Sequence, residues 1–231
     1  MIESSPNKHI REVSSFQDLV STTFQGEVNA LCWKRSLVGD FSEIVEKISF
    51  SGNMIEIDAE DLMDLELSME GQLARLVLLE DMRLLTEFGA APSLNIIKHY
   101  ESDNENPYFP TDVYSFHVDR SPIPVDTFLC TYFGAASDIV SNAQATQKIL
   151  LPEIRHQLRQ QFQGTEEGFE SFLTENFLDL HYQAQTDAQI INLGLGNLWR
   201  LTTEHPEMQV PPCIHRAPLE NLGEKRLLLI C

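Results

Sequence analysis

The run TFLCTYF at residues 127–133 contains only apolar, aromatic and β-branched side chains, a composition that is typical of a β-strand. Similar short runs occur throughout the chain beyond Pro92, separated by segments rich in Pro, Asn, Asp and Gly. They lie at residues 93–100, 113–119, 188–193, 197–202, 213–216 and 226–231. We therefore expect a mostly antiparallel sheet or barrel in this part of the chain.

Helical patterns precede and interrupt this series of strands. At residues 142–179, apolar side chains recur at helical spacing and predict two helices inserted between strands. The acidic segment from about residue 15 to residue 91 is also helical in pattern, and residues 69–88 form its most regular helix. Alternation at residues 54–57 is compatible with one short strand within that segment.

These patterns together predict a single α+β domain that spans residues 1–231. Residues 1–92 form a mainly helical segment, which we expect to pack on the outside of the sheet because its apolar faces need a partner surface. Residues 93–231 form a β-barrel core that contains the helical insertion at residues 142–179.

The composition limits the classes of partner. The chain has 16 Lys and Arg residues against 35 Asp and Glu residues, a formal net charge of −19, and no apolar tract of about 18 residues. We therefore expect neither nucleic acid nor a membrane as a partner, since both carry phosphate that this charge repels. The acidity either maintains solubility or attracts a basic partner protein. The first residues lack the pattern of a signal peptide, so we expect a cytoplasmic location and reduced cysteines.

The most specific chemical pattern is His117-Val118-Asp119 within the predicted strand at residues 113–119. Alternation in a strand places His117 and Asp119 on one face, roughly 6.5 to 7 Å apart along the backbone. An imidazole and a carboxylate are two of the three ligands in the facial triad of non-haem iron sites. Among the remaining histidines we favour His215, because its proline-bounded segment is extended and directly precedes the closing strand. We expect Arg226 to begin that strand, paired with the strand of His215 and facing the same cavity.

The order of His117, Asp119, His215 and Arg226 resembles the H-x-D…H…R pattern of the iron(II)- and 2-oxoglutarate-dependent oxygenases, which fold as a double-stranded β-helix (a jelly-roll or cupin-like barrel). The resemblance implies that His117, Asp119 and His215 hold iron(II) and that Arg226 binds the far carboxylate of 2-oxoglutarate. It implies a dioxygenase that hydroxylates a small-molecule or protein substrate, which the sequence does not identify. Segments 116–134 and 215–218, with the closing strand, also resemble an uncharacterised bacterial family, a similarity that implies no activity.

Three further residues are candidates for binding at this cavity. If Tyr132 points inward, its hydroxyl could bind a carboxylate of the oxo acid; otherwise it is a structural aromatic residue. Arg120 and Arg216 each follow a candidate metal ligand, so they either pair with surface carboxylates or contact a substrate anion at the barrel mouth.

Two other classes of function remain open at the level of sequence. The chain could be a cupin-like metal-binding protein without oxygenase activity, in which metal binds but 2-oxoglutarate has no effect. It could also be a non-catalytic barrel that binds a protein or ligand, in which the histidines are structural and Arg226 pairs with Glu220 or Glu224.

Overall fold

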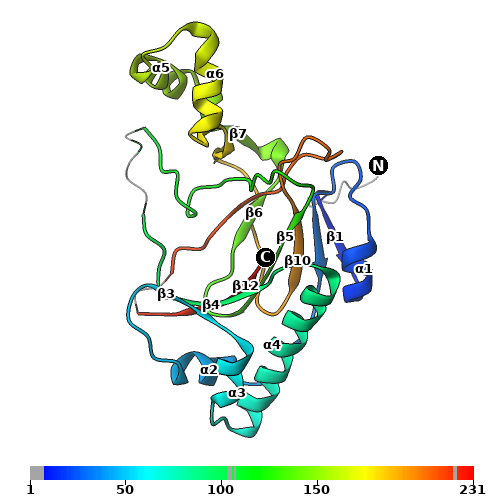
Figure 1. Ribbon diagram of the computed structural model, residues 1–231. Coiled ribbons are helices and arrows are strands. Elements are labelled where there is room, and N and C mark those ends of the chain that lie inside the picture. The colour runs from blue at the N-terminus through cyan, green and yellow to red at the C-terminus, as the bar shows by residue number, and fades with distance from the viewer. Residues whose placement is uncertain (1–7, 103–105, 107, 221–222) are drawn as a thin grey trace.

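The computed structural model describes residues 8–102, 106, 108–220 and 223–231. Its largest sheet has seven strands in the order β1-β2-β10-β5-β12-β4-β3 (Figure 1). These strands are β1 (Ile10–Val13), β2 (Ala30–Trp33), β3 (Met54–Ile57), β4 (Ser93–Ile97), β5 (Asp126–Phe133), β10 (Leu198–Thr202) and β12 (Arg226–Ile230). Neighbouring strands are antiparallel except for the parallel pair β1 and β2.

Two smaller sheets accompany the large one. One contains β11 (Ile214–Arg216), β6 (Asp138–Val140) and β9 (Ile191–Asn192), and the other contains β7 (Ala145–Gln147) and β8 (Tyr182–Ala184). Leu129 of β5 and Leu228 of β12 share an apolar core with Ile139 of β6, so one face of the large sheet packs against the three-stranded sheet. The expected α+β architecture is confirmed, although the sheets do not close into a barrel within the described residues.

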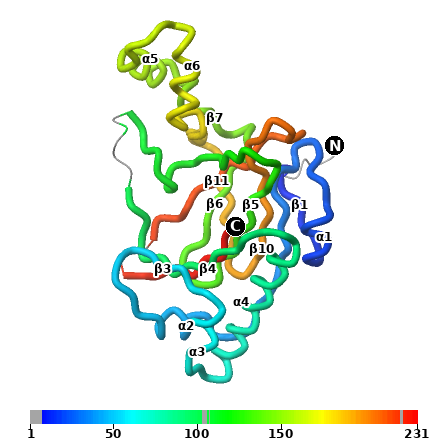
Figure 2. The backbone as a smooth tube through the Cα atoms, viewed as in Figure 1, coloured from blue at the N-terminus to red at the C-terminus, as the bar shows by residue number. Residues whose placement is uncertain are grey.

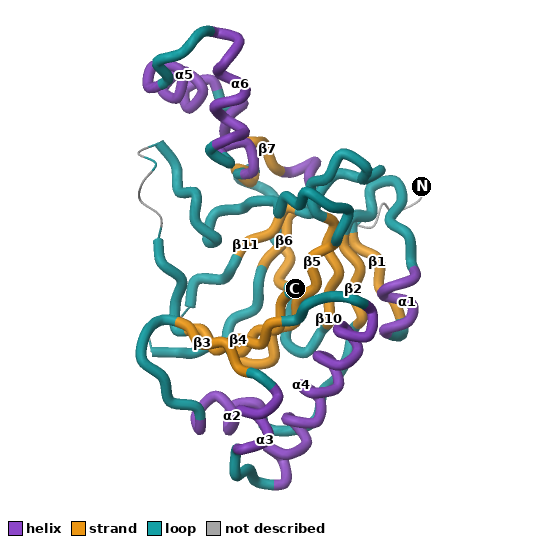
Figure 3. The backbone as a smooth tube through the Cα atoms, in the orientation of Figure 1, coloured by secondary structure: helices purple, strands orange, loops and turns teal. Residues whose placement is uncertain are grey.

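Helices from the N-terminal part of the chain cover the other face of the large sheet (Figure 3). They are α1 (Phe16–Ser21), α2 (Phe41–Lys47), α3 (Ala59–Asp64) and α4 (Met69–Phe88). The longest, α4, begins after Ser68, whose hydroxyl accepts the N–H of Gly71, and ends at Gly89 with a φ of 100° that favours glycine. Its buried Leu78 and Leu85 pack with Phe128 of β5. Residues 1–92 also supply β1, β2 and β3 to the sheet, and of these the sequence pattern indicates only β3.

The helical insertion contains the two expected helices, α5 (Pro152–Gln161) and α6 (Glu166–Glu175), which project from the sheets as a pair (Figure 2). It also contains β7 and the short 3-10 helices η1 (Asn142–Gln144), η2 (Lys148–Leu150) and η3 (Leu178–Leu180). The pair has a small apolar core of its own, to which Leu158 and Phe169 belong. No described helix combines the length and the apolar composition that crossing a membrane requires.

The predicted strand at residues 113–119 is absent. In its place the chain is irregular, and His117 forms single backbone pairs with His181 and His215. The prediction fails because no single strand runs beside this segment: the backbone of His117 bonds to His215, whereas the next residue, Val118, bonds to Leu180.

Candidate metal centre

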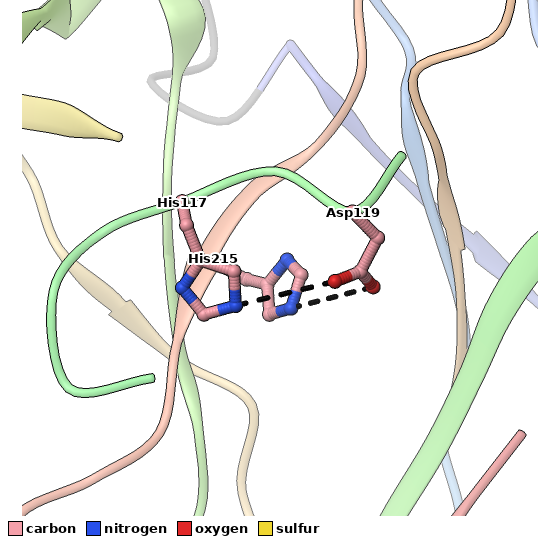
Figure 4. A group of neighbouring side chains, drawn as sticks. All are labelled: His117, Asp119 and His215. Atoms are coloured by element: carbon pink, nitrogen blue, oxygen red, sulfur yellow. Dashed lines mark ion pairs between the residues drawn. The ribbon is translucent and has the colours of Figure 1, made fainter. Parts of the chain in front are cut away.

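His117, Asp119 and His215 come together with their side chains close to one another (Figure 4). One ligand atom from each of these residues lies within 4.8 Å of the others. The Nε2 atom of His117 is 4.0 Å from Oδ1 of Asp119, and the Nε2 atom of His215 is 3.6 Å from Oδ2. The three residues selected from the sequence are therefore neighbours in the fold, and we call them the metal triad.

The backbone fixes the two histidines opposite each other. The N–H of His117 donates to the carbonyl of His215, the N–H of His215 donates to the carbonyl of His117, and both distances are 2.9 Å. This is the hydrogen-bonded pair of an antiparallel ladder, in which opposite side chains lie on the same face. The ring centroids are accordingly 4.5 Å apart. Since β11 is itself paired with β6, the three-stranded sheet holds one imidazole and positions the other.

Backbone carbonyls select the same tautomer in both rings. Nδ1 of His117 lies 2.7 Å from the carbonyl oxygen of Ser115, and Nδ1 of His215 lies 3.3 Å from that of Cys213. A carbonyl oxygen only accepts hydrogen bonds, so in the neutral form of each ring Nδ1 carries the proton and the lone pair is on Nε2. Both lone pairs are on the side of Asp119. A metal-binding imidazole is usually oriented in this way, by a hydrogen bond from the ring nitrogen that does not bind the metal.

Asp119 is held by a hydroxyl from the large sheet. Thr127 Oγ1, on β5, donates to Asp119 Oδ2 at 2.5 Å. Burial alone would raise the pKa of Asp119, but His215, the Thr127 hydroxyl and His117 together bring it below its ordinary value. Burial, followed by the neighbouring His215, lowers the pKa of His117 to about 4. At neutral pH His117 is thus neutral and Asp119 is charged, which are the forms that bind a divalent cation.

The donor atoms of the metal triad fit one transition-metal ion. Ligands bound about 2.1 Å from an ion have donor atoms roughly 3.0 to 3.5 Å apart when they occupy neighbouring positions. The observed 3.6 and 4.0 Å exceed this spacing by up to about 1 Å, and the three ligand atoms lie within 4.8 Å of one another, so the side chains would rotate inward to share one ion. Two imidazoles and one carboxylate are the donor set of the non-haem iron(II) facial triad, which leaves positions for other ligands.

Thr127→Val should weaken metal binding without removing any ligand. The substitution deletes the hydroxyl that orients Asp119, and loss of such an outer contact lowers metal affinity by about 10- to 100-fold. Competition with a fluorescent chelator measures the change. Thr86→Val is the matched control, because that hydroxyl contacts only the Met82 carbonyl on α4. Equal affinities for the two variants would show that Thr127 does not support the carboxylate.

Arg226 is a buried cation in the inter-sheet space. It is 1% exposed, and its Nη2 donates to Thr131 Oγ1 at 3.1 Å and to Ser137 Oγ at 2.7 Å. Its Nε is buried without a hydrogen-bond partner, and within the described part of the chain no carboxylate forms an ion pair with it. A buried guanidinium needs an anion to compensate its charge, so this arrangement fits an anionic ligand. The nearby charge of Glu220 favours the charged form of this guanidinium, although no described ion pair joins the two groups.

The strand pairing that places Arg226 in this space differs from the prediction. The strand of His215, β11, is not paired with β12; the two strands belong to different sheets. Instead, Thr127 contacts Asp119 and Thr131 contacts Arg226, and these threonines share one face of β5. Sequence reasoning missed both threonines, although their spacing of four residues in a predicted strand is the signal that could have identified them.

The other candidate residues lie elsewhere or have partners of their own. Tyr132 points to the helix side of β5, where its hydroxyl donates to Asp81 on α4 at 2.6 Å, so it is not a carboxylate-binding residue of the cavity but the structural aromatic residue of the second alternative. Arg120 borders the same cavity as His117 but pairs with Asp179 and Glu204. Arg216 pairs with Asp138 at 3.0 Å and lies over the Phe116 ring. Both arginines therefore pair with carboxylates, which is the first of the two alternatives given for them.

Comparison with known proteins adds no assignment, since no family model, curated protein or solved structure matches the chain.

Proposed function

We propose that this chain is an iron(II)- and 2-oxoglutarate-dependent dioxygenase that hydroxylates a substrate still to be identified. One combination of observations carries the proposal. The metal triad contacts Thr127, and the buried Arg226 guanidinium, which forms no ion pair among the described residues, contacts Thr131 on the same face of β5. The facing large and small sheets support an open double-stranded β-helix as the scaffold. His117, Asp119 and His215 would hold iron(II), and Arg226 would bind the far carboxylate of 2-oxoglutarate.

One set of residues orients the metal ligands, and Arg226 supplies the positive charge for the cosubstrate. The Ser115 and Cys213 carbonyls keep both imidazoles in the binding tautomer, and Thr127 orients the carboxylate. Thr131 and Ser137 engage one nitrogen of Arg226, which leaves Nε to receive a carboxylate oxygen. Bound iron(II) supplies the activation of dioxygen that accompanies decarboxylation of the oxo acid.

Apolar side chains between the sheets keep water away from this space. Leu129, Leu228 and Ile139 are all buried there, close in sequence to the residues that would contact the cosubstrate. Exclusion of water strengthens the interaction between Arg226 and a carboxylate, and it protects a reactive oxidant from side reactions.

The direct test is anaerobic addition of iron(II) and 2-oxoglutarate to the purified protein. We expect a weak visible metal-to-ligand absorption, followed by succinate formation when oxygen is admitted. Absence of both signals from a folded protein would reject the proposal. Metal binding that 2-oxoglutarate does not affect would instead indicate a cupin-like metal-binding protein, and absence of metal binding would indicate a non-catalytic barrel.

Arg226→Gln should weaken 2-oxoglutarate binding while the metal affinity stays the same. Hydrogen bonds to a charged group contribute about 1.5 to 3 kcal/mol, so we expect a loss of roughly 10- to 150-fold in affinity. Titration of the visible absorption with 2-oxoglutarate measures it. Arg216→Gln is the control, because Arg216 is bound to Asp138. If both variants bind 2-oxoglutarate as the wild type does, Arg226 has another role.

A further inference from the structure

Phe177 has an unfavourable backbone conformation. With φ 56° and ψ 17°, it is in the left-handed region, and no other non-glycine residue of the described chain has a positive φ. A bulky side chain in this region is a genuine outlier. Such outliers persist only where the surrounding structure imposes them, and they concentrate at ligand sites.

Several contacts impose this conformation on the turn between α6 and η3. The N–H of Phe177 donates to the Thr174 carbonyl at 3.1 Å, and the N–H of Leu180 donates to the Phe177 carbonyl at 3.2 Å. Two residues after Phe177, Asp179 is bound by Arg120, which directly follows the candidate ligand Asp119. The turn is therefore tied to the loop that carries the metal triad.

The turn also places the Phe177 ring in solvent. Phe177 is 59% exposed, whereas Phe169 and Phe162 of the same insertion pack together in its apolar core. Phe177 borders a cavity of about 350 Å³ that it shares with His117 and Asp119. This volume lies in the range of small-ligand sites.

We propose that Phe177 is a substrate-contacting residue, and that the substrate carries an aromatic ring that packs against it within reach of the metal triad. This inference rests on the proposed function, because it names the class of substrate for that site. Strain and exposure of an apolar ring are both unfavourable, and glycine would remove both. The aliphatic side chains of Val113 and Leu180 also line this cavity and offer further apolar contacts to such a ring.

Indole serves as the probe in saturation-transfer NMR on metal-free protein. We expect transfer to indole in the wild type and a decrease of roughly 2- to 12-fold in Phe177→Ala, the loss expected for one aromatic contact. Phe177→Tyr should retain the transfer because it keeps the ring. Leu150→Ala is the control, since Leu150 is an exposed apolar residue of the same insertion that does not line the cavity. Equal transfer in the wild type and Phe177→Ala would overturn the inference.

Adding Mn²⁺ separates this inference from the proposed function. If Mn²⁺ binds, the indole resonances of the wild type should broaden, because the ring lies beside a paramagnetic ion. Bound Mn²⁺ without broadening would overturn the inference even if indole binds. Failure of Mn²⁺ to bind would count against the proposed function alone, because the metal-free transfer experiment still decides whether Phe177 holds an aromatic ring.

Thermal unfolding tests whether Phe177 is held for a ligand or for the fold. Phe177→Gly should melt at a higher temperature than Phe177→Ala, because glycine accepts a φ of 56° without strain. It should nevertheless lose indole binding as Phe177→Ala does. A lower melting temperature for Phe177→Gly than for Phe177→Ala, with indole transfer retained in both, would assign Phe177 a purely structural role.

Discussion

Asp119→Ala is expected to lower the affinity of the protein for iron(II) by more than about a hundredfold, because loss of an outer-sphere contact alone already costs 10- to 100-fold. Asp119 supplies the single negative charge of the metal triad, and each imidazole Nε2 faces one of its oxygens. Without it, two neutral imidazoles remain, and no described residue outside the triad completes a comparable group. Metal analysis after dialysis and chelator competition measure the loss.

The fold should survive this substitution. The Asp119 side chain is 38% exposed, and its hydroxyl partner Thr127 lies in β5, which is held in the sheet by backbone hydrogen bonds to β10 and β12. Asp112→Ala is the matched control, because Asp112 borders the same cavity but uses its carboxylate to accept the N–H groups of Tyr114 and Ser115. Equal metal content in the two variants, both folded by circular dichroism, would remove the basis of the metal centre.

Local patterns in the sequence predicted the elements whose stability is local. The helix expected at residues 69–88 is α4, Met69–Phe88, since a serine cap and a terminal glycine mark its ends in the sequence. His117 and Asp119 also lie on one side of the chain, as expected, although no regular strand forms there. A residue and its second neighbour share a face in any extended segment, and isolated backbone pairs with His215 and His181 hold this one extended.

Features that depend on contacts between distant residues could not be predicted from local patterns. Strand β5 is buried on both faces from Thr127 to Tyr132, so its alternating residues carry no signal that separates the inter-sheet face from the helix face. For this reason the sequence left open which side of the strand Tyr132 faces. The expected pairing of β11 with β12 relied on closeness in sequence, but the connecting segment passes from the small sheet to the large one. Partner choice depends on contacts between distant residues, which a single sequence does not display.

The helix side of β5 contains a second buried charge network, between Arg35 and Asp81. The two nitrogens Nη1 and Nη2 of Arg35 donate to the two carboxylate oxygens of Asp81, both at 2.7 Å, and the Tyr132 hydroxyl donates to the same carboxylate. Asp81 is 2% exposed, and the Nε of Arg35 donates to the Gly196 carbonyl. Both charges are thus desolvated and fully engaged, and they join α4 to the sheet.

Asp81→Ala should destabilise the protein by about 3 to 5 kcal/mol, because removal of one partner leaves the other charge buried and uncompensated. Urea unfolding followed by circular dichroism measures the free energy. The matched control is Glu80→Ala, one position earlier on α4, whose surface ion pair with Arg83 is worth at most about 1 kcal/mol. Because this network lies on the opposite face of β5 from Asp119, folded Asp81→Ala protein should still bind metal at wild-type stoichiometry. A loss of stability no larger than that of Glu80→Ala would mean that the buried pair contributes little to holding α4 on the sheet.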